Sequence, residues 1–379
     1  MKKIAGEAEI PHPYARETRT SHGNQQPSTL PPRTAKLVGI ASLSPSASAQ
    51  RKGGFISSQA DFHRAMNPLT KLLSTFTKPE KPSGDSTLPP PVGMTSRFER
   101  DYLEDYAARV YSGAGTIVDL GSWLGSLTIP LLAGLERNPA AANGGADLHA
   151  YDLFQWADWM KPWQLSNADG PLQPGDTFLP EFVRQVGPYD HHKRLLIHAG
   201  DLARLGWCGR PIELLVVDVM KYWDLANCVV HDFFPCLIPG RSYVFHQDFC
   251  HYYTSWIHLI HYRLRDHFEK VASLPESGTV VFKYTSAFPL ESLRRTYSFA
   301  DFSDAEVEAA FEFSLSQVDA DQLARRQAVM AAKVMVSVHK NDPERARGEL
   351  AALAAQGWVI ERELKIVQDE VNLRLNKGR

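Results

Sequence analysis

The chain of 379 residues lacks the features that mark several large protein classes. Its four cysteines, Cys208, Cys228, Cys236 and Cys250, form no C-x-x-C pair, which argues against a disulfide framework or a zinc knuckle. No apolar run approaches the roughly 20 residues of a membrane span, and the first residues lack the apolar core of a secretory signal. Lys and Arg total 41 against 43 Asp and Glu, a net charge of −2. We therefore expect a cytoplasmic protein with no nucleic-acid and no membrane partner.

The composition, 44% hydrophobic and 22% charged, is typical of a globular protein with one large domain and appendages. Residues 1–58 are rich in Pro, Ser, Arg and Gly, and we expect a disordered or weakly docked tail there. A short helix and a Pro-rich linker are predicted over residues 59–94. The main domain is expected to span residues 95–290, and a helical extension residues 291–379.

A glycine-punctuated turn is the most informative motif of the chain. The apolar run 116–119 ends in an acid, and the turn 120–126 leads into a helical pattern. Such a strand, turn and helix present backbone N–H groups to a ligand at the carboxyl edge of a parallel sheet. A second apolar run ends in Asp152, where a carboxylate can accept both hydroxyls of a ribose. Together these features predict a pocket for a nucleotide-like cofactor.

The glycines of this turn do not match a dinucleotide fingerprint. That fingerprint needs Gly at the first, third and sixth positions so that a pyrophosphate can touch the backbone, and this chain has Gly121, Trp123 and Ser126 there. The looser spacing of Gly121 and Gly125 suits a ligand without a diphosphate. The sequence therefore favours S-adenosylmethionine over a nicotinamide or flavin cofactor.

Strand and helix patterns alternate through the main domain, which indicates a parallel sheet with helices on both faces. The last two predicted strands flank the tight-turn sequence 275–278, so we expect an antiparallel hairpin at the end of the sheet. The predicted strands are 116–119, 148–152, 194–198, 212–219, 242–246, 270–274 and 279–284.

The C-terminal part has helix signals. Ser303 and Glu306 form a capping-box pattern, and Asp342 followed by Pro343 is typical of a helix start. Gly357 is expected to end that second helix. We expect this part to serve dimerisation, as a homodimer through its helices, or to cap the substrate.

Residues 97–284 resemble class I S-adenosylmethionine-dependent methyltransferases. The closer likeness is to a bacterial subgroup found beside, or fused to, glycosyltransferases. The resemblance implies a Rossmann-like α/β sheet of seven strands, five parallel plus a C-terminal antiparallel hairpin, with helices on both faces and a C-terminal helical extension. The stretches that carry it are 117–126, 150–154, 175–178, 200–201, 217–221 and 234–242.

The resemblance also implies which residues form the turn around the methionine part of the cofactor. These residues are Gly121, Ser122, Trp123 and Gly125, and Asp119 is expected to brace the turn.

Further cofactor contacts are implied at the ends of the next strands. Asp152 is expected to bind the ribose hydroxyls, and Leu153 or Phe154 to pack on the adenine. Asp201 is expected to accept a hydrogen bond from the adenine amino group, and Asp218 to face the methyl sulfonium. Alternatively, Asp201 caps the helix that follows it, and Asp152 is a turn residue.

Methyl transfer to a hydroxyl needs a base that removes the proton of the acceptor. The predicted fifth strand ends at His246, and Asp248 and His251 follow. A neutral imidazole titrates near working pH, so His246 or His251 is the expected base, with Asp248 orienting it. The alternative is a histidine that is satisfied within the sheet edge.

A magnesium ion is not favoured at this edge, although related enzymes hold one there. Those metal-dependent O-methyltransferases use an Asp after the fourth strand and an acidic pair after the fifth. Asp218 and Asp248 occupy comparable places, but Gln247 stands where a second acid is expected. We expect the later His258, His261 and His267 on a helix surface rather than as ligands.

The resulting hypothesis is O-methylation of a small molecule or of a sugar in a glycan or secondary metabolite. A non-catalytic binding or scaffold module is the alternative from another class, supported by Gln247 and by the long extensions. A nicotinamide oxidoreductase is disfavoured by Trp123.

Overall fold

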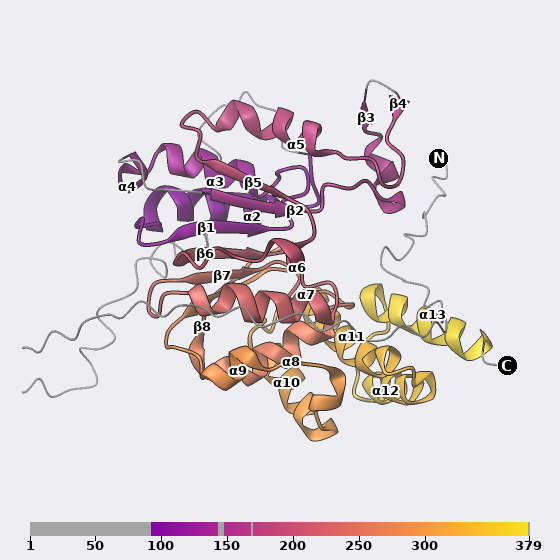
Figure 1. Cartoon of the computed structure of the whole chain (residues 1–379). Coiled ribbons are helices and arrows are strands. Elements are labelled where there is room, and N and C mark those ends of the chain that lie inside the picture. The colour runs from indigo at the N-terminus through magenta and orange to yellow at the C-terminus, as the bar shows by residue number, and fades with distance from the viewer. Residues whose placement is uncertain (1–91, 143–147, 168–169, 378–379) are drawn as a thin grey trace, which may run out of the picture.

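The computed structural model describes residues 92–142, 148–167 and 170–377 (Figure 1). The predicted tail over residues 1–58 lies outside this part, as does all but the last three residues of the predicted segment 59–94. The domain boundaries of the chain therefore remain predictions.

A seven-stranded sheet forms the centre of the molecule, in the order β5-β2-β1-β6-β7-β9-β8. The first five neighbours pair in parallel, and β9 joins β7 and β8 in antiparallel pairs. This is the Rossmann-like methyltransferase plan, so the predicted fold class is confirmed. The strands are β1 Thr116–Leu120, β2 Leu148–Asp152, β5 Leu195–Ala199, β6 Ile212–Val217, β7 Tyr243–His246, β8 Phe268–Ser273 and β9 Val280–Tyr284.

The chain reverses its direction of travel across the sheet between β1 and β6. From β1 it moves outward to β2 and β5, then returns to place β6 on the other side of β1. Ligands of open α/β sheets bind at such a switch point, beyond the carboxyl ends of the strands. The predicted site residues lie at this edge because they follow β1, β2, β5, β6 and β7 in the chain.

Helices cover both faces of the sheet (Figure 1). The larger helices are α2 Arg97–Asp105, α3 Thr128–Glu136, α5 Leu179–Val186, α7 Trp223–Cys228, α8 Ser255–Arg263, α10 Asp304–Ser316, α11 Leu323–His339, α12 Pro343–Ala355 and α13 Arg362–Lys377. Shorter helical segments are α4 Pro139–Ala142, α6 Leu202–Leu205, α9 Leu290–Arg294, the π-helical η2 Tyr106–Val110 and η5 Val229–Phe233, and the 3-10 segments η3 Asp158–Trp163, η4 Gly187–Tyr189, η6 Phe234–Cys236, η7 Arg265–His267 and η8 Phe299–Asp301.

The alternation of side chains along β6 separates two hydrophobic layers. Leu214 and Val216 pack with α2, α3 and α5 on one face. Leu215 and Val217 pack on the other face with α7, α8, α10 and part of α11. Every residue of β6 is buried. Its residues 214–217 are all apolar, as in a strand covered on both faces, and the buried Glu213 before them accepts the backbone N–H groups of Ser112 and Ala114.

The C-terminal helices share the core of the sheet. Phe311 of α10 and Val329 of α11 belong to the same hydrophobic cluster as Val244 of β7. The predicted helix starts are confirmed, since Ser303 accepts the Glu306 N–H and Asp342 caps α12. This extension is therefore packed onto the domain through α8.

Burial of α8 corrects one sequence prediction. His258 and His261 were expected on a helix surface, but they are 0% and 3% exposed. Helix α8 lies between the sheet layer and α10 and α11, and it is apolar on more than one side. His267 lies beyond the end of α8, in η7, and is half-buried.

The segment between β2 and α5 forms an insertion at the carboxyl edge. It holds η3 and a two-stranded hairpin, β3 Ser166–Asn167 and β4 Gly170–Pro171. Figure 1 shows this hairpin and α13 on the same side of the sheet. Among the helices of the described ranges, none combines the length and the apolar character that a membrane crossing requires.

Candidate functional site

The loop between β1 and α3 needs glycine at two positions. Gly121 has φ +92°, and a Cβ there would lie 2.8 Å from the carbonyl oxygen of Asp218. Gly125 has φ +88°, and its Cβ would lie 2.6 Å from a methyl group of Val186. Both the left-handed conformation and the close approach exclude larger residues. The glycines thus hold the loop tightly between β6 and α5.

Trp123 stands between the two glycines in a conformation that is rare for its type. Its φ is +42°, and its backbone N–H donates to Oδ2 of Asp152 at 2.9 Å. The side chain is 9% exposed and its ring centroid lies 5.8 Å from that of Trp159 and 4.8 Å from that of Trp163. A left-handed bulky residue stores strain of the kind found at functional sites.

Asp152 anchors the end of β2 through both carboxylate oxygens. Oδ1 accepts the N–H of Phe154 at 2.7 Å, while Oδ2 accepts that of Trp123. The backbone N–H of Leu153 also interacts with this carboxylate. Because a carboxylate has about four acceptor positions, capacity for a further donor remains. Leu153 beside it is 51% exposed, whereas Phe154 is buried in the core. Of the two predicted adenine neighbours, only Leu153 is accessible to a ligand.

Asp119 and Ser122 brace the loop from inside. Asp119 is fully buried, and its Oδ2 accepts the hydroxyl of Thr128 at 2.6 Å. Burial raises the pKa of Asp119 to about 6, against the effect of this hydrogen bond. The hydroxyl of Ser122 donates to the backbone oxygen of Asp119 at 3.2 Å. Asp119 thus holds the start of the loop and of α3 together, and its part in a cofactor site stays a prediction.

Asp201 caps a helix, as the alternative interpretation of the sequence has it. It is the N-cap of α6, and its Oδ1 accepts the N–H of Ala203 at 3.0 Å. The side chain is 50% exposed and its Oδ2 lies 3.8 Å from Arg204. The contact of Asp201 with a cofactor remains a prediction.

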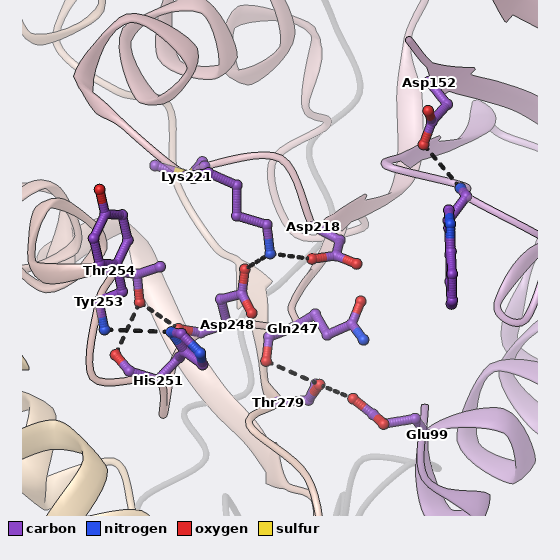
Figure 2. A network of polar contacts seen from close by, with 12 residues as sticks. Glu99, Asp152, Asp218, Lys221, Gln247, Asp248, His251, Tyr253, Thr254 and Thr279 are labelled. Carbon is purple, nitrogen blue, oxygen red and sulfur yellow. Dashed lines mark hydrogen bonds and ion pairs between the residues drawn. The ribbon is translucent and has the colours of Figure 1, made fainter. Parts of the chain in front are cut away.

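Lys221 connects the ends of β6 and β7, as Figure 2 shows. Its ammonium donates to Oδ1 of Asp218 at 2.6 Å and also to Oδ2 of Asp248. The three side chains keep only 16–27% of their area exposed. Because β6 and β7 are neighbours, the residues that follow them meet at this edge.

The surroundings shift the pKa values of the two carboxyl groups of this triad in opposite directions. Burial raises the pKa of Asp218 to about 8, although the Lys221 ammonium opposes this shift. Burial also acts on Asp248, but Lys221 and His251 outweigh it and keep the pKa of Asp248 below its ordinary value. The neighbouring carboxylates hold the pKa of Lys221 above its ordinary value. The ammonium therefore stays charged and is a poor base.

The two candidate histidines lie in different surroundings. His246 is 2% exposed, packs near Phe249, His261 and Phe282, and burial lowers its pKa to about 4. His251 is half-buried in the loop after β7, and its Nδ1 accepts the Tyr253 N–H at 3.3 Å. Both histidines interact electrostatically with Asp248: His251 helps to lower the pKa of Asp248, and Asp248 partly opposes the effect of burial on the pKa of His246.

Sequence reasoning missed two parts of this network. Lys221 follows Asp218 at a spacing of three, a signal for an ion pair, but its bond to Asp248 depends on strand order. The buried Glu99 accepts a hydrogen bond from the Thr279 hydroxyl at 2.5 Å. The sequence around Glu99 indicates only its capping box with Ser96 and does not predict this contact. The side-chain Oε1 of Gln247 has no hydrogen-bond partner among the described residues, whereas its backbone oxygen accepts the Thr279 hydroxyl at 3.5 Å.

A small cavity of about 30 Å³ lies against the glycine loop. A cavity of this volume has room for about one water-sized group. Within the part of the chain that the structure describes, no group of three or more His, Cys, Asp or Glu side chains is arranged to hold a metal ion. The cavity is lined by Met94, Thr95, Gly121, Ser122, Trp123, Ser126, Leu127, Asp218 and Gln247.

Known proteins are similar to this chain in structure and not in sequence. No family model and no curated protein matches the chain. It is similar to the O-methyltransferase NovP, with 16% identity, a TM-score of 0.35, and coverage of 50% of this chain and 78% of that one. The calicheamicin methyltransferase CalS11 has 16% identity and a TM-score of 0.38, with coverage of 64% of this chain and 100% of that one. The mitomycin 7-O-methyltransferase MmcR has 16% identity and a TM-score of 0.24, with coverage of 39% of this chain and 35% of that one. The strand order of the sheet, rather than these low identities, assigns the fold.

Proposed function

We propose that this chain is an S-adenosylmethionine-dependent methyltransferase that methylates a hydroxyl group of a small molecule or sugar. The observation that carries the proposal is the hydrogen bond between the Gly121–Gly125 loop, at Trp123, and the Asp152 carboxylate at the switch point of the sheet. The remaining acceptor capacity of Asp152 suits a ribose hydroxyl. The exposed Leu153 offers an apolar surface to an adenine ring.

The bound cofactor would supply an electrophilic methyl group. The residues of the chain would hold the acceptor in line with it and remove the hydroxyl proton. His251 is the best-placed base, because it is accessible and because the negative charge of Asp248 stabilises its protonated form. Lys221 would keep Asp248 fixed while this proton moves.

Release of S-adenosylhomocysteine from S-adenosylmethionine tests this proposal. The full chain is incubated with the cofactor and a panel of hydroxylated sugars and phenols, and the variant Asp152→Asn is the control. We expect turnover with some acceptors and at least a tenfold loss in the variant. Turnover that is equal in the variant and the parent would contradict the role of the β2 end.

A non-catalytic binding module is the second candidate. The small cavity and the buried Trp123 ring favour it, because both reduce the space beside the loop. Binding of S-adenosylhomocysteine with no turnover on any acceptor of the panel would support this candidate over the first.

A further inference from the structure

The loop after β7, residues 247–254, is held by helices from the end of the chain. Glu363 lies in the first turn of α13, and its Oε2 accepts the backbone N–H of Tyr252 at 2.7 Å. This bond joins residues 111 positions apart. Tyr252 directly follows His251, so the bond fixes the backbone next to the proposed base.

A second helix holds the same loop from another side. His339 at the end of α11 contacts the carbonyl oxygen of Tyr253 through Nε2 at 3.2 Å, and the two rings lie 5.0 Å apart. Next along the chain, the hydroxyl of Ser255 donates to the carbonyl oxygen of Ala332 at 2.7 Å. Tyr252 and Tyr253 also pack against the hydrophobic cluster that α11, α12 and α13 form.

Bonds inside the loop connect these anchors to the residues of the site. The hydroxyl of Thr254 donates to the carbonyl oxygen of Asp248 at 2.8 Å and to that of His251 at 3.1 Å. A shift of the Tyr252 backbone would therefore move both Asp248 and His251. Such a shift matters because a displacement of about 1 Å at a reacting group costs on the order of 100-fold in rate.

We propose that Glu363 is a positioning residue for methyl transfer, which places His251 and Asp248 by accepting the Tyr252 N–H. This proposal rests on the proposed function for its effect on rate. It assigns the C-terminal helices a part in the active site, although none of their residues needs to touch the substrate.

The surroundings of Glu363 give the role a pH signature. Burial raises the pKa of Glu363 to about 7, and the negative charge of Asp248 adds to the shift. The other titratable groups that face it are the Cys250 thiol and the Tyr252 phenol, whose pKa values lie above their ordinary ones. As pH rises through 7, the accepting group becomes a carboxylate and the bond to Tyr252 becomes charge-assisted.

Two variants of the full chain separate positioning from general stability. Glu363→Ala removes the acceptor, and Glu363→Gln keeps an acceptor oxygen without a titrating group. Asp369→Ala on the same helix is the control, because its exposed side chain pairs with Lys365 one turn earlier in α13. The measurements are kcat, the affinity for S-adenosylhomocysteine, and hydrogen exchange of the amides in residues 248–256.

For Glu363→Ala we expect faster amide exchange in residues 248–256, a 10- to 100-fold lower kcat and an affinity for S-adenosylhomocysteine within twofold of the parent. Glu363→Gln should restore most of kcat and the protection of the amides in residues 248–256, and this protection should no longer change near pH 7 as it does in the parent. Exchange and kcat of Glu363→Ala equal to those of Asp369→Ala would overturn the proposal. If the alanine variant fails to fold, the pH dependence of amide protection in Glu363→Gln is the test, and a dependence near pH 7 equal to that of the parent would overturn the proposal equally.

The exchange measurement keeps this test separate from the proposed function. A parent that transfers no methyl group would remove the proposed function, while exchange in residues 248–256 still reports whether Glu363 holds the loop. Unchanged exchange in the alanine variant, with an active parent, would remove only the role of Glu363.

Discussion

Trp123 donates its backbone N–H to Oδ2 of Asp152, and this bond of 2.9 Å joins the loop after β1 to the end of β2. The left-handed conformation of Trp123 costs of order 1–3 kcal/mol in such a residue. The hydrogen bond from Trp123 to the Asp152 carboxylate offsets part of that cost, and the same carboxylate also accepts the Phe154 N–H. One side chain thus shapes the turn and remains open to a ligand.

We expect Asp152→Ala to destabilise the fold even without a ligand. The variant leaves two backbone donors without an acceptor, at about 1–3 kcal/mol for each donor that stays buried. Urea unfolding measures the change, and Asp201→Ala is the control, since an exposed cap is worth about 1 kcal/mol. A loss no larger than that of the control would show that the two donors find other partners.

Lys221→Met should also lower the free energy of unfolding. It leaves Asp218 and Asp248 facing each other without the ammonium between them. We expect a loss of about 3 kcal/mol in the free energy of unfolding. This is the lower end of the range for removing one partner of a buried ion pair, because these side chains keep 16–27% of their area exposed. Adding Asp218→Asn to this variant should recover part of the loss. An unchanged unfolding midpoint in Lys221→Met would contradict a structural ion pair.

The same lysine makes a prediction about divalent metal. With an ammonium bonded to both carboxylates, we expect no heat from Mg²⁺ titrated into the parent at millimolar concentration. Lys221→Met, which frees the two carboxylates, should bind Mg²⁺ weakly. Tight Mg²⁺ binding by the parent that Asp248→Asn abolishes would mean that the ammonium yields its place to a metal.

Acid should weaken the protein through its buried histidines. Burial lowers the pKa of His246 to about 4 and that of His258 to about 3, and that of His261 lies well below its ordinary value. The pKa of each of these histidines is lower in the folded protein than the value of about 6.5 in the unfolded chain. Their neutral forms therefore contribute stability that is fully present above pH 6.5 and is lost as pH falls through the pKa of the folded protein. The buried histidines therefore lower the urea midpoint as pH falls from 6.5 to 4, and this contribution should be smaller in His258→Leu than in the parent. Equal slopes in the two proteins would contradict this cause.

The sheet was predictable because its strands are short apolar runs that end at turn residues. The run 116–119 and the observed Thr116–Leu120 differ by one residue, since burial on both faces leaves few alternatives for such a segment. The burial of His258 and His261 was missed because it depends on α10 and α11, which cover α8. The apolar neighbours of these histidines in α8 were the available signal.

The site was predictable where local chain direction decides it and missed where distant segments meet. Asp152 and Asp218 follow strands whose ends must share one edge. Lys221 bonds to a residue 27 positions later, and Glu363 to one 111 positions earlier, so neither contact is encoded in a local pattern. Tertiary contacts of this kind depend on how helices pack, which periodicity alone does not specify.

Calorimetric titration of the full chain with S-adenosylhomocysteine tests the central claim most directly, with Asp152→Asn as the paired variant. The account predicts a micromolar Kd for the parent and at least tenfold weaker binding in the variant, as the loss of a charged acceptor of about 1.5–3 kcal/mol implies. A folded parent that releases no heat with this ligand, or a variant that binds it as tightly as the parent, would contradict the account.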